Sequence, residues 1–279
     1  SYTDKERKRL MKAFGYTYEE YRTSILNMAT NASEGIGAMG IDTPLPVLDK
    51  RHQPLFNYFK QLFAQVTNPP IDAIREKVVT ATRVFAGEEG NLLEEKPENC
   101  HMLQINNPIL TNTDLMKIRN IKEESHIKVT TLSLVYYKNT SLEKAIDRLF
   151  VEVDRAHRDG VNIIILSDRG VDEYHVAIPS LLAVSAVHHH LVDTRKRTSL
   201  SVILESGEPR EVHHFATLLG YGACAINPYL AYEAIDDLIK TGMLKKDYYA
   251  AVNDYNEAVI SGIVKIASKM GISTIQSYM

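Results

Sequence analysis

The chain has 279 residues, 44% of them hydrophobic and 24% charged, which is ordinary globular composition with enough apolar material to bury a core. A net charge of −3 gives no electrostatic reason to expect nucleic acid or an acidic membrane surface as a partner. The sequence contains no run of about 18 apolar residues, so it predicts no membrane-spanning helix. The two cysteines, Cys100 and Cys224, lack CxxC spacing, which excludes a self-contained iron–sulfur cluster or thiolate zinc site in this chain and suits a reducing compartment.

Residues 1–100 show helical patterns separated by loops rich in proline and glycine. Apolar residues at helical spacing predict a helix over about 53–65, which the Pro69-Pro70 pair then stops. Asp72 can cap a second helix that runs to about Phe85. We therefore expect a mainly helical N-terminal third.

From about residue 100 onward, short β-rich runs alternate with helical ones, which is typical of an α/β fold with a parallel sheet. The runs at 161–167 and 199–205 are almost wholly apolar, as expected of strands covered on both faces. The expected strands are 102–105, 127–135, 161–167, 199–205 and 223–227. The expected helices are 113–121, 141–159, 179–193, 209–219, 229–241 and 246–270.

The sequence starts without Met, and its composition does not tail off toward Met279, so we expect the chain to be a piece of a larger protein. The N-terminal SYTDKERKRL has no apolar segment behind it and does not predict a signal peptide.

Polar residues follow the ends of neighbouring predicted strands. The strand at 161–167 runs into Asp168 and Arg169, and the next strand ends at Glu205 and is followed by Glu208. Chemistry in parallel sheets collects at the carboxyl ends of the strands, so these four side chains form a candidate polar rim. One interpretation is a pocket for a small ligand or for a neighbouring domain. The other is turn and capping chemistry, with Arg169 in a structural ion pair with Glu205 or Glu208.

The glycines Gly35, Gly37 and Gly40 have G-x-G-x-x-G spacing. A dinucleotide-binding fingerprint also needs a preceding strand and a following helix, and the prolines at 44 and 46 prevent that helix. The pattern favours a tight loop fitted against another surface. The segment 66–76, a stiff turn followed by a helix start, is open to two interpretations, a plain helix-to-helix connection or a domain contact.

The run AVSAVHHHL at 183–191 holds three consecutive histidines. On a helix each step turns the side chain by about 100°, which puts His188 among apolar positions including Val192, His189 at the flank and His190 on the opposite side. Helical metal pairs need spacings of three or four residues, so one helix cannot bind a metal with all three. The pattern favours packing, with the histidines near a helix C-terminus, over a metal site.

Several long blocks resemble the large subunit of glutamate synthase, and together they cover nearly the whole chain. These blocks are FAQVTNPPID at 63–72, GNLLE at 90–94, LSDRG at 166–170, PSLLAVSAVHHH at 179–190, ESGE at 205–208, GYG at 220–222, AINPYL at 225–230 and SKMGIST at 268–274. The resemblance is to the central domain of that subunit, and the last dozen residues resemble the entry into its FMN domain.

The resemblance implies a parent protein with a glutaminase domain, this central domain, and a synthase domain that holds FMN and an iron–sulfur cluster. Such a protein converts L-glutamine, 2-oxoglutarate and two electrons into two L-glutamate, and ammonia passes between its sites through an internal channel. NADPH, NADH or ferredoxin supplies the electrons outside this chain, in some members through a small reductase subunit. The implied location is the cytoplasm, or the plastid in a plant or alga. The implied fold is a degenerate or incomplete barrel.

We therefore expect residues 1–100 to form the helical part of the central domain, 101–245 its βα core, and 246–279 a helix leading into the FMN domain. The chain is expected to link the two catalytic domains, to help wall the channel, and to hold no cofactor, metal or catalytic residue of its own. Small or neutral polar groups suit ammonia passage, so the candidate channel or domain-interface residues are Thr67, Asn68, Gly35 and Gly37. The alternative is an independent ligand or regulatory domain that uses the polar rim.

Overall fold

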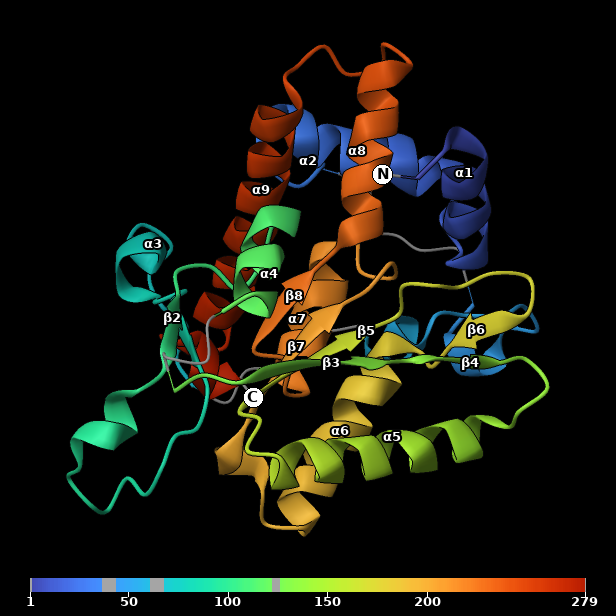
Figure 1. Ribbon diagram of the computed structural model, residues 1–279. Coiled ribbons are helices and arrows are strands. Elements are labelled where there is room, and N and C mark those ends of the chain that lie inside the picture. The colour runs from blue at the N-terminus through green and yellow to red at the C-terminus, as the bar shows by residue number, and fades with distance from the viewer. Residues whose placement is uncertain (1, 37–43, 61–67, 122–125, 279) are drawn as a thin grey trace. The chain divides into compact units, whose positions relative to one another are not determined.

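A computed structural model describes residues 2–36, 44–60, 68–121 and 126–278, and Figure 1 shows its elements. The chain forms two compact units, each assembled from separate stretches of sequence. So far as they are described, the first unit comprises Ser1–Ala81, Glu208–Thr217 and Leu230–Ser273, and the second comprises Thr82–Gly207, Leu218–Tyr229 and Thr274–Met279.

The second unit contains a four-stranded parallel sheet with the strand order β3-β5-β7-β8. Every residue of β5 and β7 is buried, which explains why both strands are apolar along almost their whole length. The predicted α/β fold class is confirmed, because parallel strands alternate with helices. In the part of the chain that the structure describes, these strands do not close into a barrel. The strands are β3 (Val129–Ser133), β5 (Ile163–Ser167), β7 (Ser201–Glu205) and β8 (Ala225–Asn227).

Helices follow the strands, as the alternating pattern predicts. Helix α5 (Leu142–Arg158) begins at Ser141, whose hydroxyl accepts a hydrogen bond from the Lys144 backbone N–H, and it buries Leu149 and Val153 on one face. It contacts β3 and also α6 (Ser180–Asp193), and Figure 1 shows both helices along the same side of the sheet. The other helices of the alternating region are α4 (Asn112–Arg119), α7 (Val212–Gly220) and α8 (Tyr229–Lys240).

Two small antiparallel ribbons accompany the sheet. One pairs β1 (Val84–Ala86) with β2 (Leu103–Ile105), and the other pairs β4 (Val135–Tyr137) with β6 (His175–Ala177). The second ribbon is tied to the ends of β3 and β5, since the Leu134 N–H donates to the Ser167 carbonyl and the Ile178 N–H donates to the Leu134 carbonyl. The ribbon of β4 and β6 thus continues from the carboxyl edge of the sheet, and it carries the polar side chains of Tyr136, Tyr137 and His175. Short 3-10 turns occur at η4 (Pro97–Cys100), η6 (Arg197–Ser199) and η7 (Ile275–Tyr278).

The first unit is helical, and its longest element is α9 (Tyr248–Lys269), which packs along α2 (Leu26–Asn31). Ile25 and Met28 are almost fully buried there. No helix among the described residues is long and apolar enough to cross a membrane. The other elements are α1 (Asp4–Ala13), η1 (Glu20–Ile25, a π-helix), η2 (Pro46–Leu48), η3 (Leu55–Phe59) and α3 (Glu76–Val79).

The two helices predicted between residues 53 and 85 are wrong in detail. Residues 55–59 form only the 3-10 turn η3, and 61–65 lie outside the described residues. The Asp72 carboxylate accepts from the Ile74 backbone N–H in a turn, and the helix that follows, α3, has four residues. Residues 84–86 form a strand instead, because they pair with residues 103–105, a partner that local spacing does not reveal.

Candidate functional site

The carboxyl edge of the parallel sheet carries a row of polar residues at one level. The register aligns Ser133 with Ser167, Ser167 with Glu205, and Glu205 with Asn227. Each of the four is the last residue of its strand. In parallel sheets this edge is the usual place for binding and chemistry, so it is the first candidate site.

Glu205 is buried at this edge and accepts hydrogen bonds on both carboxylate oxygens. Its Oε1 accepts from the Ser167 hydroxyl at 2.6 Å and from Arg119 Nη2 at 3.0 Å, and its Oε2 accepts from Arg169 Nε at 2.9 Å. Burial by itself raises the pKa of Glu205, but the Ser167 hydroxyl and the two guanidinium groups outweigh it and leave the pKa below its ordinary value. The carboxylate is therefore ionised and fixed in an ion-pair network.

Asp168 has no exposed surface and is held by a second set of donors. The Ser206 hydroxyl donates at 2.5 Å, the Gly207 backbone N–H at 3.0 Å, and the Tyr229 hydroxyl at 2.8 Å. The Arg169 guanidinium lies 4.1 Å from the centre of the Tyr229 ring, so the two carboxylate clusters share a boundary. We call these two clusters together the strand-end network.

Three of the four residues of the predicted polar rim come together in the strand-end network. Asp168, Arg169 and Glu205 meet there, and the Arg169–Glu205 ion pair is one of the two pairings that the turn-chemistry interpretation names. Glu208 belongs to the first unit, where its backbone carbonyl accepts from Arg210 Nη1 at 2.9 Å.

The predicted rim lacks four side chains of the network. Arg119 comes from the end of α4, Ser167 ends β5, and Ser206 and Tyr229 donate to Asp168. Tyr229 could have been expected, because it begins α8 directly after β8 and so starts from the same edge of the sheet. Arg119 gives no such indication, since it lies far from Glu205 in sequence.

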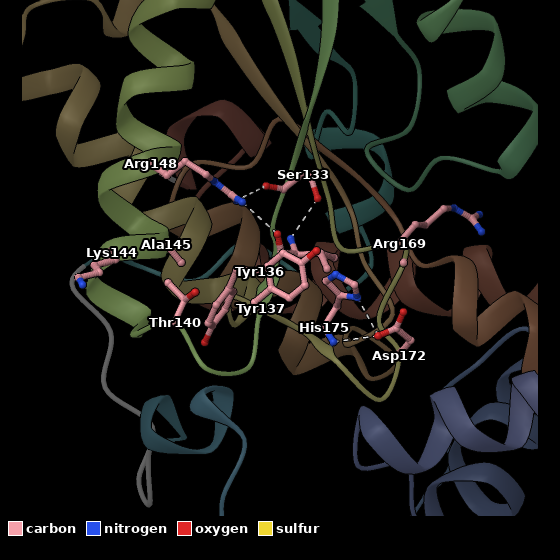
Figure 2. Close-up of a pocket in the computed structure, with 12 residues that line it drawn as sticks. Ser133, Tyr136, Tyr137, Thr140, Lys144, Ala145, Arg148, Arg169, Asp172 and His175 are labelled. Carbon is pink, nitrogen blue, oxygen red and sulfur yellow. Dashed lines mark hydrogen bonds and ion pairs between the residues drawn. The ribbon is translucent and has the colours of Figure 1, made fainter.

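An open hollow, which Arg169 of the strand-end network also lines, lies beside the ends of β3 and β5 and has a volume of about 640 Å³ (Figure 2). Arg148 donates from its two terminal nitrogens to the backbone carbonyls of Val135 and Ser133, and Asp172 accepts from His175. Figure 2 shows the ends of Lys144 and Arg169 on opposite sides of the hollow and directed away from each other. The cationic side chains of this hollow therefore do not converge on one ligand position.

The three histidines point in three directions, as the helical geometry predicts. His188 is half-buried and its Nδ1 accepts from Arg197 Nε at 2.9 Å, and burial followed by the Arg197 charge lowers its pKa. His189 is exposed, with Nδ1 2.8 Å from the Ser185 carbonyl oxygen. His190 stacks on Phe150 at 4.3 Å, and its Nε2 lies 3.0 Å from Asp154 Oδ1.

The expected place of Val192 on the buried face is wrong, because its side chain is 48% exposed in the last turn of α6. Val187 is fully buried instead. Among the described residues, no group of three or more His, Cys, Asp or Glu side chains is arranged to hold a metal ion.

Two of the four candidate channel residues are described. Asn68 is exposed and begins the segment that leads to α3, and Gly35 is exposed beyond the end of α2. Thr67 and Gly37 lie outside the described residues.

The residues that the structure describes at the strand ends, and the two cysteines, do not fit the cofactors that the resemblance implies for the parent. An iron–sulfur cluster usually takes four thiolates, and the chain has 2 cysteines, Cys100 on the surface and Cys224 in the interior. Burial raises the pKa of Cys224 to about 12, which keeps it a thiol. The phosphate of FMN needs a cluster of donors, whereas the strand ends of β5 and β7 present the buried carboxylates of Asp168 and Glu205.

The fold and the strand-end network define an α/β domain with a four-stranded parallel sheet, in which the acidic groups at the strand ends bind donors of the same chain. A family model described as "Glutamate synthase central domain" matches residues 9–279. The chain therefore belongs to the glutamate synthase central domain family.

Three relatives, from two bacteria and a yeast, illustrate the similarity. It is 46% identical over 267 residues to the glutamate synthase [NADPH] large chain of Bacillus subtilis, covering 96% of this chain and 17% of that protein. It is 41% identical over 274 residues to glutamate synthase [NADH] of Schizosaccharomyces pombe, covering 96% and 13%. It is 39% identical over 282 residues to ferredoxin-dependent glutamate synthase 2 of Synechocystis, covering 95% and 18%. The chain thus spans less than a fifth of each of these relatives.

Proposed function

We propose that this chain is the connecting domain of a glutamate synthase that forms two L-glutamate from L-glutamine, 2-oxoglutarate and two electrons. The observation that supports the proposal is the family match over residues 9–279 in a chain that covers 13% to 18% of its full-length relatives. Its partners are then the glutaminase and FMN synthase domains of the same polypeptide, with a small reductase subunit in some parents. FMN and the iron–sulfur cluster belong to the synthase domain.

The chemistry of the strand-end network supports a structural part for this domain. Asp168 and Glu205 accept hydrogen bonds on both of their carboxylate oxygens from groups of the same chain. Buried carboxylates satisfied in this way stabilise the strand ends and leave little hydrogen-bonding capacity for a substrate. We infer that the isolated chain binds no flavin and turns over neither glutamine nor 2-oxoglutarate.

We also propose that the domain helps to wall the ammonia channel, with Asn68 and its neighbour Thr67 and the glycine loop at Gly35 and Gly37 as the contributing residues. Asn68 supports this part of the proposal because its side chain is exposed and neutral, and so can face another domain. A neutral amide exchanges hydrogen bonds with ammonia and does not favour its protonation, whereas an adjacent carboxylate stabilises ammonium, which its charge then holds in place.

The test is Asn68→Asp in the intact parent enzyme, with free ammonia and glutamate measured against glutamine consumed. We expect ammonia to escape and the yield of glutamate per glutamine to fall. Asn253→Asp is the matched control, because Asn253 is exposed in the middle of α9 of the same unit. Tight coupling in the Asn68 variant, equal to that of the control, rules out a channel position for Asn68.

A further inference from the structure

The C-terminal end of α9 lies directly against the segment that begins at Asn68. We propose that Gly271 and Ser268 are positioning residues, which hold the backbone on either side of Pro69-Pro70 so that the Asn68 side chain keeps a fixed place in the channel wall. This inference rests on the proposed function and adds the residues on which Asn68 depends.

Gly271 makes the close approach possible. Its φ is +70°, and a Cβ at this position would lie 2.6 Å from the Pro69 carbonyl oxygen and 2.7 Å from the Asn68 Cβ. Both atoms belong to the backbone or its first side-chain carbon, so they cannot move aside as the end of a flexible side chain can. Glycine is therefore required by the conformation and by the neighbour together.

Ser268 fixes the other side of the proline pair through two different atoms. Its backbone carbonyl accepts from the Ile71 N–H at 2.8 Å, and its hydroxyl donates to Glu76 Oε2 at 2.9 Å. Ser268 has no exposed surface, so its own atoms in both bonds are shielded from water. One buried residue thus secures the start of the segment and the first residue of α3.

The result is an exposed side chain on a constrained backbone. Asn68 is exposed, while Gly271 contacts its backbone on one side and Ser268 binds Ile71 three residues later. Pro69 and Pro70 between them have restricted φ angles, which stiffens the connection. A group that acts by its position needs this kind of support, because it contributes nothing to the packing that would otherwise hold it.

The test is Gly271→Asn in the intact parent enzyme, with Gly242→Asn as the matched control. Asparagine tolerates a positive φ, and Gly242 has a φ of +75° with no atom within 4 Å of a Cβ placed there, so only the Gly271 variant meets a neighbour. We expect free ammonia per glutamate formed to rise by roughly tenfold in Gly271→Asn while the glutaminase rate is retained, since a displacement of about 1 Å has effects of this order or larger. Coupling in Gly242→Asn stays at the wild-type level.

Ser268→Ala gives a second, milder variant, since it keeps the carbonyl that binds Ile71 and removes only the hydroxyl, which bonds to Glu76 Oε2 and to the Lys265 carbonyl of its own helix. We expect it to uncouple in the same direction, and it decides the question if Gly271→Asn does not fold. If Asn68→Asp releases ammonia but neither the Gly271 nor the Ser268 variant does, the positioning inference is wrong and the proposed channel position of Asn68 stands. If glutamine hydrolysis and glutamate formation stay coupled in Asn68→Asp, the proposed channel position of Asn68 is itself wrong, whatever the Gly271 and Ser268 variants show.

Discussion

Among the residues at the carboxyl edge of the sheet, Asp168 is the one whose removal we expect to lower the free energy of unfolding most. It is fully buried and accepts from Ser206, Gly207 and Tyr229. We expect Asp168→Ala to lower the free energy of unfolding by about 3 kcal/mol and Tyr229→Phe by about 1 kcal/mol, because buried donors lose a charged acceptor in the first case and one bond is removed in the second. Urea denaturation measures both. Asp147→Ala on the exposed side of α5 is the control, and an equal effect there would show that the network adds no stability.

Glu205 makes a separate prediction about pH. Its pKa in the folded chain lies below the ordinary 4.5, so its stabilisation is complete above that value and is lost as the pH falls through the lowered pKa. Glu205→Gln should therefore be less stable than wild type near neutral pH, by roughly 2 kcal/mol, since a charge-assisted set of bonds becomes a neutral one. The two stability curves should converge as the pH falls below 4.5 and through the lowered pKa of Glu205. A difference that stays constant over this range contradicts the assignment.

The candidate site was partly predictable at the residue scale. The rule that parallel strands end at one edge was enough to bring Asp168, Arg169 and Glu205 together. It was not enough to find Arg119, whose side chain crosses from α4, because a long side chain can pair with any carboxylate within its reach. Nor could it assign each donor to its carboxylate, which depends on hydrogen-bond geometry of a few tenths of an ångström.

At the scale of elements, the join between α6 and the turn before β8 depends on one glycine. Gly222 has a φ of +114°, and a Cβ there would lie 2.7 Å from His188 Nδ1, the atom that accepts from Arg197. We expect Gly222→Ala to destabilise the chain by roughly 1–3 kcal/mol more than Gly170→Ala, because overpacking is added to backbone strain. Gly170 is a matched control, with a φ of +103° and nothing within 4 Å. Equal unfolding free energies for the two variants would mean that the His188 ring moves aside without an energetic cost, which contradicts the prediction.

The elements that sequence predicted well are those with a strong local pattern. The buried runs became β5 and β7, and the helical spacing of 141–159 became α5 with its Ser141 cap. The elements it missed, β1, β4 and β6, have three residues each and exist through their antiparallel partners. Pairing between distant segments leaves no periodicity within either of them, so local reasoning could not find these ribbons.

At the scale of the whole molecule, the two compact units are each built from non-contiguous segments. Residues 208–217 and 230–273 belong with the N-terminal 81 residues, and the stretch 218–229 between them belongs with the sheet. A division made along the sequence cannot express this, because it assigns neighbouring residues to the same part of the fold.

The strand-end network also predicts how the whole chain responds to metabolites. Because Asp168 and Glu205 are satisfied by their own chain, we expect isothermal titration of the 279-residue chain with glutamine, glutamate or 2-oxoglutarate to give no heat of binding. Saturable heat with any of the three, abolished by Arg169→Ala, would revive the interpretation of the rim as a ligand or regulatory site.

The central claim is that this chain connects catalytic domains and is not itself catalytic. The most direct measurement is to purify the 279-residue chain alone, record its absorbance spectrum after incubation with FMN and desalting, and assay it with glutamine and with 2-oxoglutarate. The account predicts a colourless protein, folded by circular dichroism, that turns over neither substrate. A yellow protein with retained flavin absorbance, or turnover of either substrate above the background, would contradict it.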